Sequence, residues 1–255
     1  MGIGLIVAAA AIFINAQIGY KQASDSYQKI EKQYVSDKDA SGVPIIDFDA
    51  LAQTNPEIVG WIYVPGTNIN YPVVQTNNNS KYLNTLFDGT SNASGAIFLD
   101  SDDTAPGMVD QQTTIYGHHM NDGSMFNVIS DTTDQTTFDS IEFVYYITRD
   151  ATYKLRPLAT KVVEDTYAKR ARPILRATTL KNYLSEMLDG ASAVASDAGD
   201  RAARNQGRNA CDLSFVIAEQ HACCHGAHAG RGISCSRVAK KAPFQIGYST
   251  TVREK

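Results

Sequence analysis

The residues best able to do chemistry in this 255-residue chain are His118, near its middle, and a group of cysteines and histidines near its C-terminus. The β-branched run at residues 113–115 predicts a strand, and Gly117 predicts that His118 begins a loop. An imidazole at the end of a strand is held by a rigid scaffold and still reaches solvent, which suits a group that takes up and releases protons. The same position also suits a histidine with a structural role.

All four cysteines lie between Cys211 and Cys235, and three of the five histidines lie among them, at positions 221, 225 and 228. A thiol beside an imidazole can act as a nucleophile, whereas several thiols and imidazoles together can bind zinc. Zinc binding is the competing interpretation. It is the less favoured one, because the cysteine spacings do not form the Cys-x2-Cys pair of common zinc motifs. The absence of other cysteines suits an exported protein that uses one thiol as a reagent.

The size and charge of the chain narrow the classes of function. A chain of 255 residues with 43% hydrophobic content fits one large domain with appendages. The formal net charge of −4 and the scattered Lys and Arg side chains provide no basic stripe, so nucleic-acid binding is not expected. No organic cofactor is indicated. A solvated loop is expected at Asp100, Asp102 and Asp103. Calcium ligation there is the minor alternative, because the spacing and the glycine of a calcium loop are missing.

The N-terminal residues predict a membrane anchor. Residues 2–14 are apolar without interruption and residues 15–19 extend the run only weakly, so the run is shorter than the roughly 20 residues of a full span. A signal peptide, a buried helix and an anchor whose upstream end is missing are the possible interpretations. The Ala-x-Ala spacing at Ala9 and Ala11 lies inside the apolar run, which favours an uncleaved anchor. We expect an anchor at 1–19, a helical stalk or linker at 20–44, and one domain at 45–255 with a divergent tail from residue 210.

Local signals predict the elements that lead into this domain. Residues 20–38 carry Tyr and Ile side chains at spacings that favour an amphipathic helix. A short strand or helix is expected at 45–52. Asn55 and Pro56 are expected to begin a helical turn before the next strand.

Turn residues and β-rich runs predict the sheet. The Pro-Gly-Thr-Asn run at 65–68 predicts a hairpin between residues 61–64 and 69–75, because Pro fixes φ and Gly allows a positive φ. Further strands are expected at 96–99, 138–147 and 151–163, and an amphipathic helix from 178 to about 190.

Residues 116–126, Tyr-Gly-His-His-Met-Asn-Asp-Gly-Ser-Met-Phe, closely resemble the catalytic-histidine segment of class B sortases, which reads Tyr-Gly-His-Asn-Met before a Gly-Ser-Met-Phe turn. Residues 55–75 and 82–100 resemble other parts of the same family. The resemblance implies a mostly β fold, an antiparallel β-barrel with appended helices. It also implies a cysteine transpeptidase in which His118 manages protons. His119 stands where the family usually has Asn and is expected to be an exposed loop residue.

The same resemblance implies partners and a location. Its substrates would be the sorting-signal peptides of secreted proteins, cleaved through a thioester and transferred to an amine of cell-wall peptidoglycan or of a pilin. The protein would be a single-pass protein of the cell membrane with its catalytic domain outside the cell.

The family places its cysteine at the end of a strand that reads Thr-Leu-x-Thr-Cys and its arginine on the next strand. Residues 213–218 fit that pattern best and put Ala218 in the nucleophile's place, which implies an inactive module that binds peptides. A shifted register makes Cys223 the nucleophile and Arg231 the cation that stabilises the oxyanion. Cys224 is the second choice, since its side chain would point to the opposite face of a strand.

The leading hypothesis is the active enzyme, with His118, Cys223 and Arg231 as its catalytic residues. The Gly- and Ala-rich run at 226–232 also fits a tail that differs from the ancestral one and does not complete the barrel.

Overall fold

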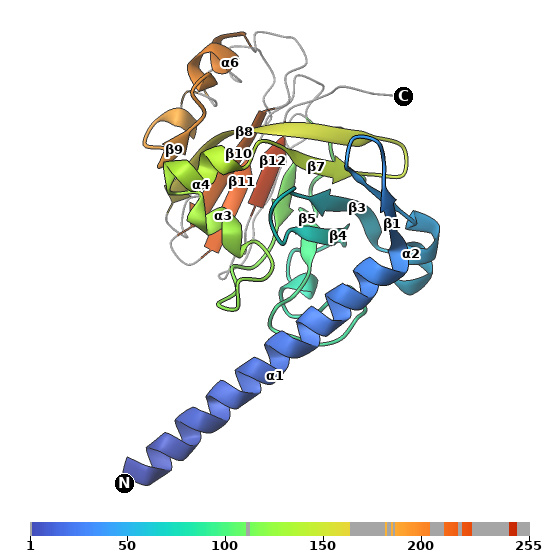
Figure 1. The fold of residues 1–255 in the computed structure, drawn as a ribbon, viewed down its shortest axis with the longest axis vertical. Coiled ribbons are helices and arrows are strands. Elements are labelled where there is room, and N and C mark those ends of the chain that lie inside the picture. The colour runs from blue at the N-terminus through green and yellow to red at the C-terminus, as the bar shows by residue number, and fades with distance from the viewer. Residues whose placement is uncertain are drawn as a thin grey trace.

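A computed structural model of the chain shows a long N-terminal helix that extends from a β-rich body (Figure 1). The structure describes residues 2–110, 113–163, 182, 185, 187–204, 212–218, 221–225 and 245–248, the last three segments by their backbone. Short helices lie around a curled sheet in the body, and the N-terminus lies at the far end of the long helix (Figure 1).

Helix α1 spans Gly2–Tyr34 without interruption. Its N-terminal half is exposed and apolar, and the helix is long and apolar enough to cross a membrane, with a mean hydropathy of 1.8 in its most apolar window. Its C-terminal half packs on the body, because Ala23, Tyr27, Ile30 and Tyr34 recur at helical spacing and are all buried. The Tyr27 hydroxyl also donates a hydrogen bond to the Gly95 carbonyl, at 2.7 Å.

The helix predicted at residues 20–38 ends earlier than expected, at Tyr34. Strand β1 (Val35–Lys38) follows and pairs antiparallel with strand β2 (Pro44–Ile46). In the turn between them, Asp39 Oδ1 accepts hydrogen bonds from the Ser41 and Val43 amides, at 2.8 and 3.0 Å. An aspartate that satisfies nearby amides in this way favours a turn over a continued helix, so the chain reverses here.

Helix α2 (Phe48–Thr54) begins at Asp47, whose Oδ1 accepts a hydrogen bond from the Ala50 amide at 2.9 Å. The turn predicted to begin at Asn55 and Pro56 is present: the Ile58 amide donates to the Asn55 carbonyl at 3.2 Å, and Asn55 Oδ1 accepts from the Glu57 amide at 3.0 Å. The sequence did not indicate that Asn55 also ends the preceding helix. Asn55 ends α2 in an extended conformation, and its amide donates to the Leu51 carbonyl at 2.8 Å. The Nδ2 of its side chain donates hydrogen bonds elsewhere, as described below.

One curled sheet forms the body and contains ten strands in the part of the chain that the structure describes. With β3 (Ile58–Tyr63) and β4 (Asn70–Val74), which form the predicted hairpin, its strands are β5 (Ile97–Leu99), β6 (Thr114–Tyr116), β7 (Val144–Ile147), β8 (Thr152–Val163), β9 (Ala193–Val194), β10 (Asp212–Ala218), β11 (His221–His225) and β12 (Gln245–Tyr248). Neighbouring strands pair antiparallel, except that β4 with β5 and β8 with β10 are parallel. The pairing of β10 with β8 brings the two ends of the sheet together, as closure of a barrel requires. The predicted fold class is confirmed, with a mixed sheet in place of a purely antiparallel one.

The remaining helices are short: η1 (Lys81–Leu83), α3 (Asn127–Asp131), α4 (Gln135–Ser140) and α6 (Ala198–Arg204). Helix α4 replaces the first half of the strand predicted at 138–147. Asp134 caps it by accepting a hydrogen bond from the Thr137 amide at 2.9 Å, so β7 begins only at Val144. The helix predicted at 178–190 lies mostly outside the described residues, but the chain turns at Gly190 with φ +69°, where that helix is predicted to end.

The core of the body is rich in aromatic side chains, and the largest that are fully buried are Trp61, Tyr82, Tyr116, Tyr146, Phe87, Phe98 and Phe126.

The prediction of a solvated loop at Asp100 is wrong. Asp100 is 3% exposed and accepts a hydrogen bond from the Tyr116 hydroxyl at 2.5 Å. Asp103 accepts one from the Thr114 amide at 2.6 Å, and burial, with Asp100 close by, raises the pKa of Asp103 well above its usual value. These carboxyl groups hold the strand that leads to His118.

Candidate active site

His118 lies two residues beyond the end of β6, at the start of the loop that leads to α3. Gly117 makes this exit possible, because a Cβ at this position would lie 2.4 Å from Ile97 Cδ1 and 2.7 Å from Phe126 Cδ2. The loop then folds back, and the Phe126 amide donates a hydrogen bond to the His118 carbonyl at 2.9 Å. The backbone of His118 is therefore fixed on both sides.

The imidazole of His118 is partly buried, and its Nε2 lies 2.8 Å from the Leu83 carbonyl oxygen. A carbonyl can only accept a hydrogen bond, so Nε2 carries a proton whenever this bond is formed. Nδ1 is then the nitrogen that gains or loses the second proton. Burial lowers the pKa of His118, although the bond to Leu83 opposes this, so the ring is neutral at pH 7 and available as a base.

The lowered pKa of His118 predicts a loss of stability in acid. Its pKa in the folded chain lies below the value of about 6.5 of an unfolded chain, so the unfolded state binds the proton first as the pH falls. The contribution of the neutral ring is complete above about pH 6.5 and is lost as the pH falls through the folded pKa. Urea unfolding at a series of pH values measures this. As the pH falls, the free energy of unfolding should decrease more steeply for the wild type than for His118→Gln. Parallel curves for the two proteins would contradict this.

Gly95 leaves the space in which the imidazole meets the Leu83 carbonyl. Its φ is +58°, and a Cβ here would lie 2.4 Å from the Tyr82 carbonyl oxygen, 2.9 Å from that of Leu83 and 3.1 Å from His118 Cδ2. The backbone therefore excludes a side chain at this position.

Gly95→Ala is expected to destabilise the chain more than Gly89→Ala. Both glycines have a positive φ, but a Cβ at Gly89 meets nothing within 4 Å. Both variants pay the cost of an L-residue in this conformation, and only Gly95→Ala adds overpacking, which costs about 1–3 kcal/mol. Chemical denaturation of the two variants measures the difference. Equal losses of unfolding free energy would show that a Cβ at position 95 is not crowded by its neighbours.

The backbone places the predicted cysteines beside the strand that carries the histidine. Strand β11, which contains Cys223 and Cys224, pairs with β6 through Cys224 with Ile115 and His225 with Thr114. Because the pairing is antiparallel, the residues before Cys224 lie toward the end of β6 that leads to His118.

The other predicted candidates have different outcomes. Ala218 is the last residue of β10 and pairs with His221 and Val163. His119 is exposed, as predicted. Arg231 lies outside the described residues, as do Cys211, Cys235 and His228. Within the described residues, no group of three or more His, Cys, Asp or Glu side chains could hold a metal ion.

Comparisons with known proteins show similarity to sortases. The model of the sortase domain matches residues 62–184, which include His118 and end before β10. Sortase B of Staphylococcus aureus (strain NCTC 8325 / PS 47) is 30% identical over 145 residues, which are 56% of this chain and 59% of that protein. Sortase B of Listeria monocytogenes serovar 1/2a is 40% identical over 76 residues, 30% of each chain. Residues 62–184 are therefore similar to the sortase domain, and both of these relatives are class B sortases.

Solved sortase structures share the fold. Sortase B from B. anthracis in complex with AAEK1 superposes with a TM-score of 0.64 at 23% identity, over 91% of this chain and 97% of that one. The Staphylococcus aureus sortase B-substrate complex superposes with a TM-score of 0.59 at 19% identity, over 91% and 95%. The aligned part of this chain spans about three fifths of one curated relative and under a third of the other.

The sequence predicts His118 as a site residue but does not predict the groups that hold its ring. The acceptor for Nε2 is a backbone carbonyl, at Leu83, so the type of side chain there gives no sign of it. Gly95 was noted only as part of the segment 82–100 that resembles the family. The glycine itself was a possible signal, because glycine adopts a positive φ, here +58°, more easily than other residues.

Proposed function

We propose that this protein is a cysteine transpeptidase. It cleaves the C-terminal sorting signal of a secreted protein and transfers that protein to an amine of cell-wall peptidoglycan or of a pilin. The observation that supports this most is the pairing of β11, the strand of Cys223 and Cys224, with β6, the strand that leads to His118. This backbone pairing supports the proposal that the thiol of Cys223 and the imidazole of His118 act together.

In the proposed reaction, His118 Nδ1 takes the proton of the Cys223 thiol, and the sulfur attacks the carbonyl carbon of the scissile peptide bond. The carbon–nitrogen bond breaks, the proton passes from His118 to the departing amine, and a thioester remains on the sulfur. An acceptor amine then attacks the thioester carbon and the carbon–sulfur bond breaks, which forms the new amide bond. The amine's proton passes through His118 to the sulfur and restores the thiol. The protonated Nε2, held on Leu83, leaves Nδ1 as the nitrogen for these proton transfers.

Arg231 is the proposed cation for the oxyanion that forms on the carbonyl oxygen, because a fixed positive charge stabilises that developing negative charge. The proposal for Arg231 rests on its position eight residues after Cys223 in the sequence.

An inactive peptide-binding module is the alternative, and one observation favours it. β10 ends at Ala218, and residues 213–218 match the family's nucleophile strand best in pattern. With alanine as the equivalent of the nucleophile, the chain would bind sorting peptides and form no thioester.

A sorting-signal peptide that carries a vinyl sulfone separates the two functions, because it reacts covalently with an activated thiol. The enzyme predicts labelling that is lost in Cys223→Ala and retained in Cys224→Ala. The inactive module predicts binding of the peptide without labelling of any cysteine. Labelling lost only in Cys224→Ala would keep the transpeptidase and overturn the choice of Cys223.

We also propose that α1 anchors the protein in the cell membrane as a single span, with the catalytic domain outside. The exposed apolar half of α1 supports this, since none of its most apolar window is buried in the body. The full chain is expected to stay with the membrane pellet after an alkaline carbonate wash, and deletion of residues 2–19 is expected to move it to the supernatant. Protease added to intact cells should then digest the domain of the full chain. A full chain found in the supernatant would contradict the anchor, and a protected domain would contradict the orientation.

A further inference from the structure

A polar network lies behind the carbonyl that holds His118. Its centre is Tyr82, the middle residue of η1, whose side chain is 2% exposed. The Tyr82 hydroxyl accepts a hydrogen bond from Asn55 Nδ2 at 2.8 Å and donates one to Glu57 Oε2 at 2.5 Å. A buried hydroxyl with both a donor and an acceptor in place has one preferred position, so the ring of Tyr82 is fixed.

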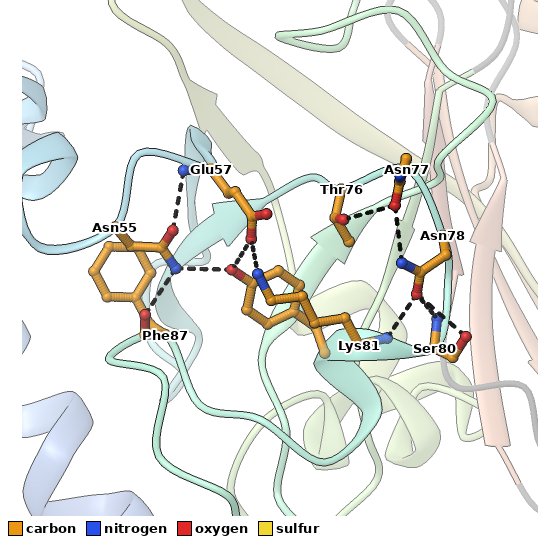
Figure 2. Close-up of polar contacts among 9 residues, drawn as sticks. Asn55, Glu57, Thr76, Asn77, Asn78, Ser80, Lys81 and Phe87 are labelled. Carbon is orange, nitrogen blue, oxygen red and sulfur yellow. Dashed lines mark hydrogen bonds and ion pairs between the residues drawn. The ribbon is translucent and has the colours of Figure 1, made fainter.

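The partners of Tyr82 are fixed in turn. Asn55 Nδ2 also donates to the Phe87 carbonyl at 2.8 Å, and Asn55 Oδ1 accepts from the Glu57 amide at 3.0 Å. Glu57 Oε2 also forms an ion pair with Lys81 Nζ at 2.5 Å (Figure 2). Burial raises the pKa of Glu57, but the hydrogen bonds from Lys81 and Tyr82 outweigh it and hold this pKa below its usual value, so Glu57 stays an acceptor at neutral pH.

The loop before η1 is held in the same way. Asn78 Oδ1 accepts hydrogen bonds from the Ser80 and Lys81 amides, both at 3.0 Å (Figure 2). On the other side of η1, the Tyr82 carbonyl accepts from the Ala96 amide at 2.9 Å, next to Gly95. The peptide unit that follows Tyr82 ends at the Leu83 amide, which donates to the Ser80 carbonyl at 3.3 Å, and the Leu83 carbonyl lies in the next unit. The anchored ring and backbone of Tyr82 therefore restrict where the Leu83 carbonyl points.

We propose that Tyr82 is a positioning residue for His118: its phenol, held between Asn55 and Glu57, fixes the Leu83 carbonyl, and this carbonyl keeps a proton on His118 Nε2. The proposal rests on the proposed function in one respect only, the role of Nδ1 as the nitrogen that exchanges protons with the thiol and the departing amine. The tautomer of His118 is a property of the resting protein and does not require a substrate or a reactive thiol. A failure of the transpeptidase proposal therefore leaves the tautomer measurable.

The test is ¹⁵N NMR of the full chain in detergent micelles, labelled with ¹⁵N-histidine, at a pH at which the ring is neutral. The signals of His118 are those absent from His118→Gln. In the wild type the Nε2–H tautomer should predominate. In Tyr82→Phe the ratio of the Nε2–H to the Nδ1–H tautomer should fall roughly two- to tenfold, the range that one net hydrogen bond spans.

Tyr146→Phe is the matched control, because it also removes a buried tyrosine hydroxyl. That hydroxyl donates to the Pro106 carbonyl and belongs to a different part of the core. The tautomer ratio in this variant should equal that of the wild type. If Tyr82→Phe does not fold, Glu57→Ala removes the acceptor of the phenol at a partly exposed site and should lower the ratio in the same direction. An unchanged ratio in the folded Tyr82 or Glu57 variant, or an equal fall in Tyr146→Phe, would overturn the proposal.

Discussion

Cys223→Ala is expected to abolish transpeptidation of a sorting-signal peptide. The thioester of the proposed reaction forms on this sulfur, and alanine offers no atom that could replace it. Turnover should therefore fall to the rate of the uncatalysed reaction, as measured by chromatography of the cleaved peptide and of its amine adduct. The fold should be unchanged, because cysteine to alanine is a small change in volume.

Cys224→Ala is the control for this loss. Cys224 is the neighbour of Cys223 in β11, so both variants alter the same strand. Adjacent side chains of a strand point to opposite faces, so only one of the two thiols can share a face with the substrate. Retained turnover in Cys224→Ala together with loss in Cys223→Ala is the expected result. Full activity in Cys223→Ala would show that Cys223 is not the nucleophile.

His118→Gln is expected to lower turnover by about 10²–10⁴-fold, the usual contribution of a positioned acid and base. Glutamine can still donate a hydrogen bond to the Leu83 carbonyl but cannot exchange a proton near neutral pH. The loss should fall on kcat more than on KM, because proton transfer belongs to the chemical step.

His119→Gln serves as the control for His118, since His119 is the exposed neighbour in the same loop. It should retain activity within about threefold, as surface substitutions away from a site usually change little. A large loss in His119→Gln with little change in His118→Gln would mean that the catalytic base has been assigned to the wrong histidine.

The parts of the fold that were predicted correctly are those with a local cause. The β3–β4 hairpin follows from Pro65 and Gly66 in its turn, with φ +78° at Gly66. The exit of His118 from β6 follows from Gly117. Both signals act within a few residues, so the order of the sequence is enough to show them.

The parts that were missed depend on contacts between distant segments. The turn at Asn55 was predicted, but the bonds of its side-chain amide to Tyr82 and Phe87, which are about thirty residues away, were not. Asp100 is buried because the Tyr116 hydroxyl reaches it from β6. The Leu83 carbonyl reaches His118 across 35 positions of sequence. No local pattern encodes such pairings.

The sequence left two candidates for the nucleophile's place, Ala218 and Cys223, with Cys223 as the leading hypothesis. The family pattern fits residues 213–218 best, and β10 occupies these residues. The pairing of β11 with β6 supports Cys223, and no local pattern predicts it, because it joins residues more than a hundred positions apart.

The most direct test of the central proposal, that His118 acts on the thiol of Cys223, is the alkylation rate of each cysteine in the full chain near pH 7, read by peptide mass spectrometry. The thiolate is the form that reacts, so a neighbouring imidazole that takes the thiol proton accelerates alkylation. In His118→Gln, alkylation of Cys223 should slow by about tenfold or more, whereas Cys211, Cys224 and Cys235 should react as in the wild type. Equal rates for Cys223 in the two proteins would show that the imidazole and the sulfur do not meet.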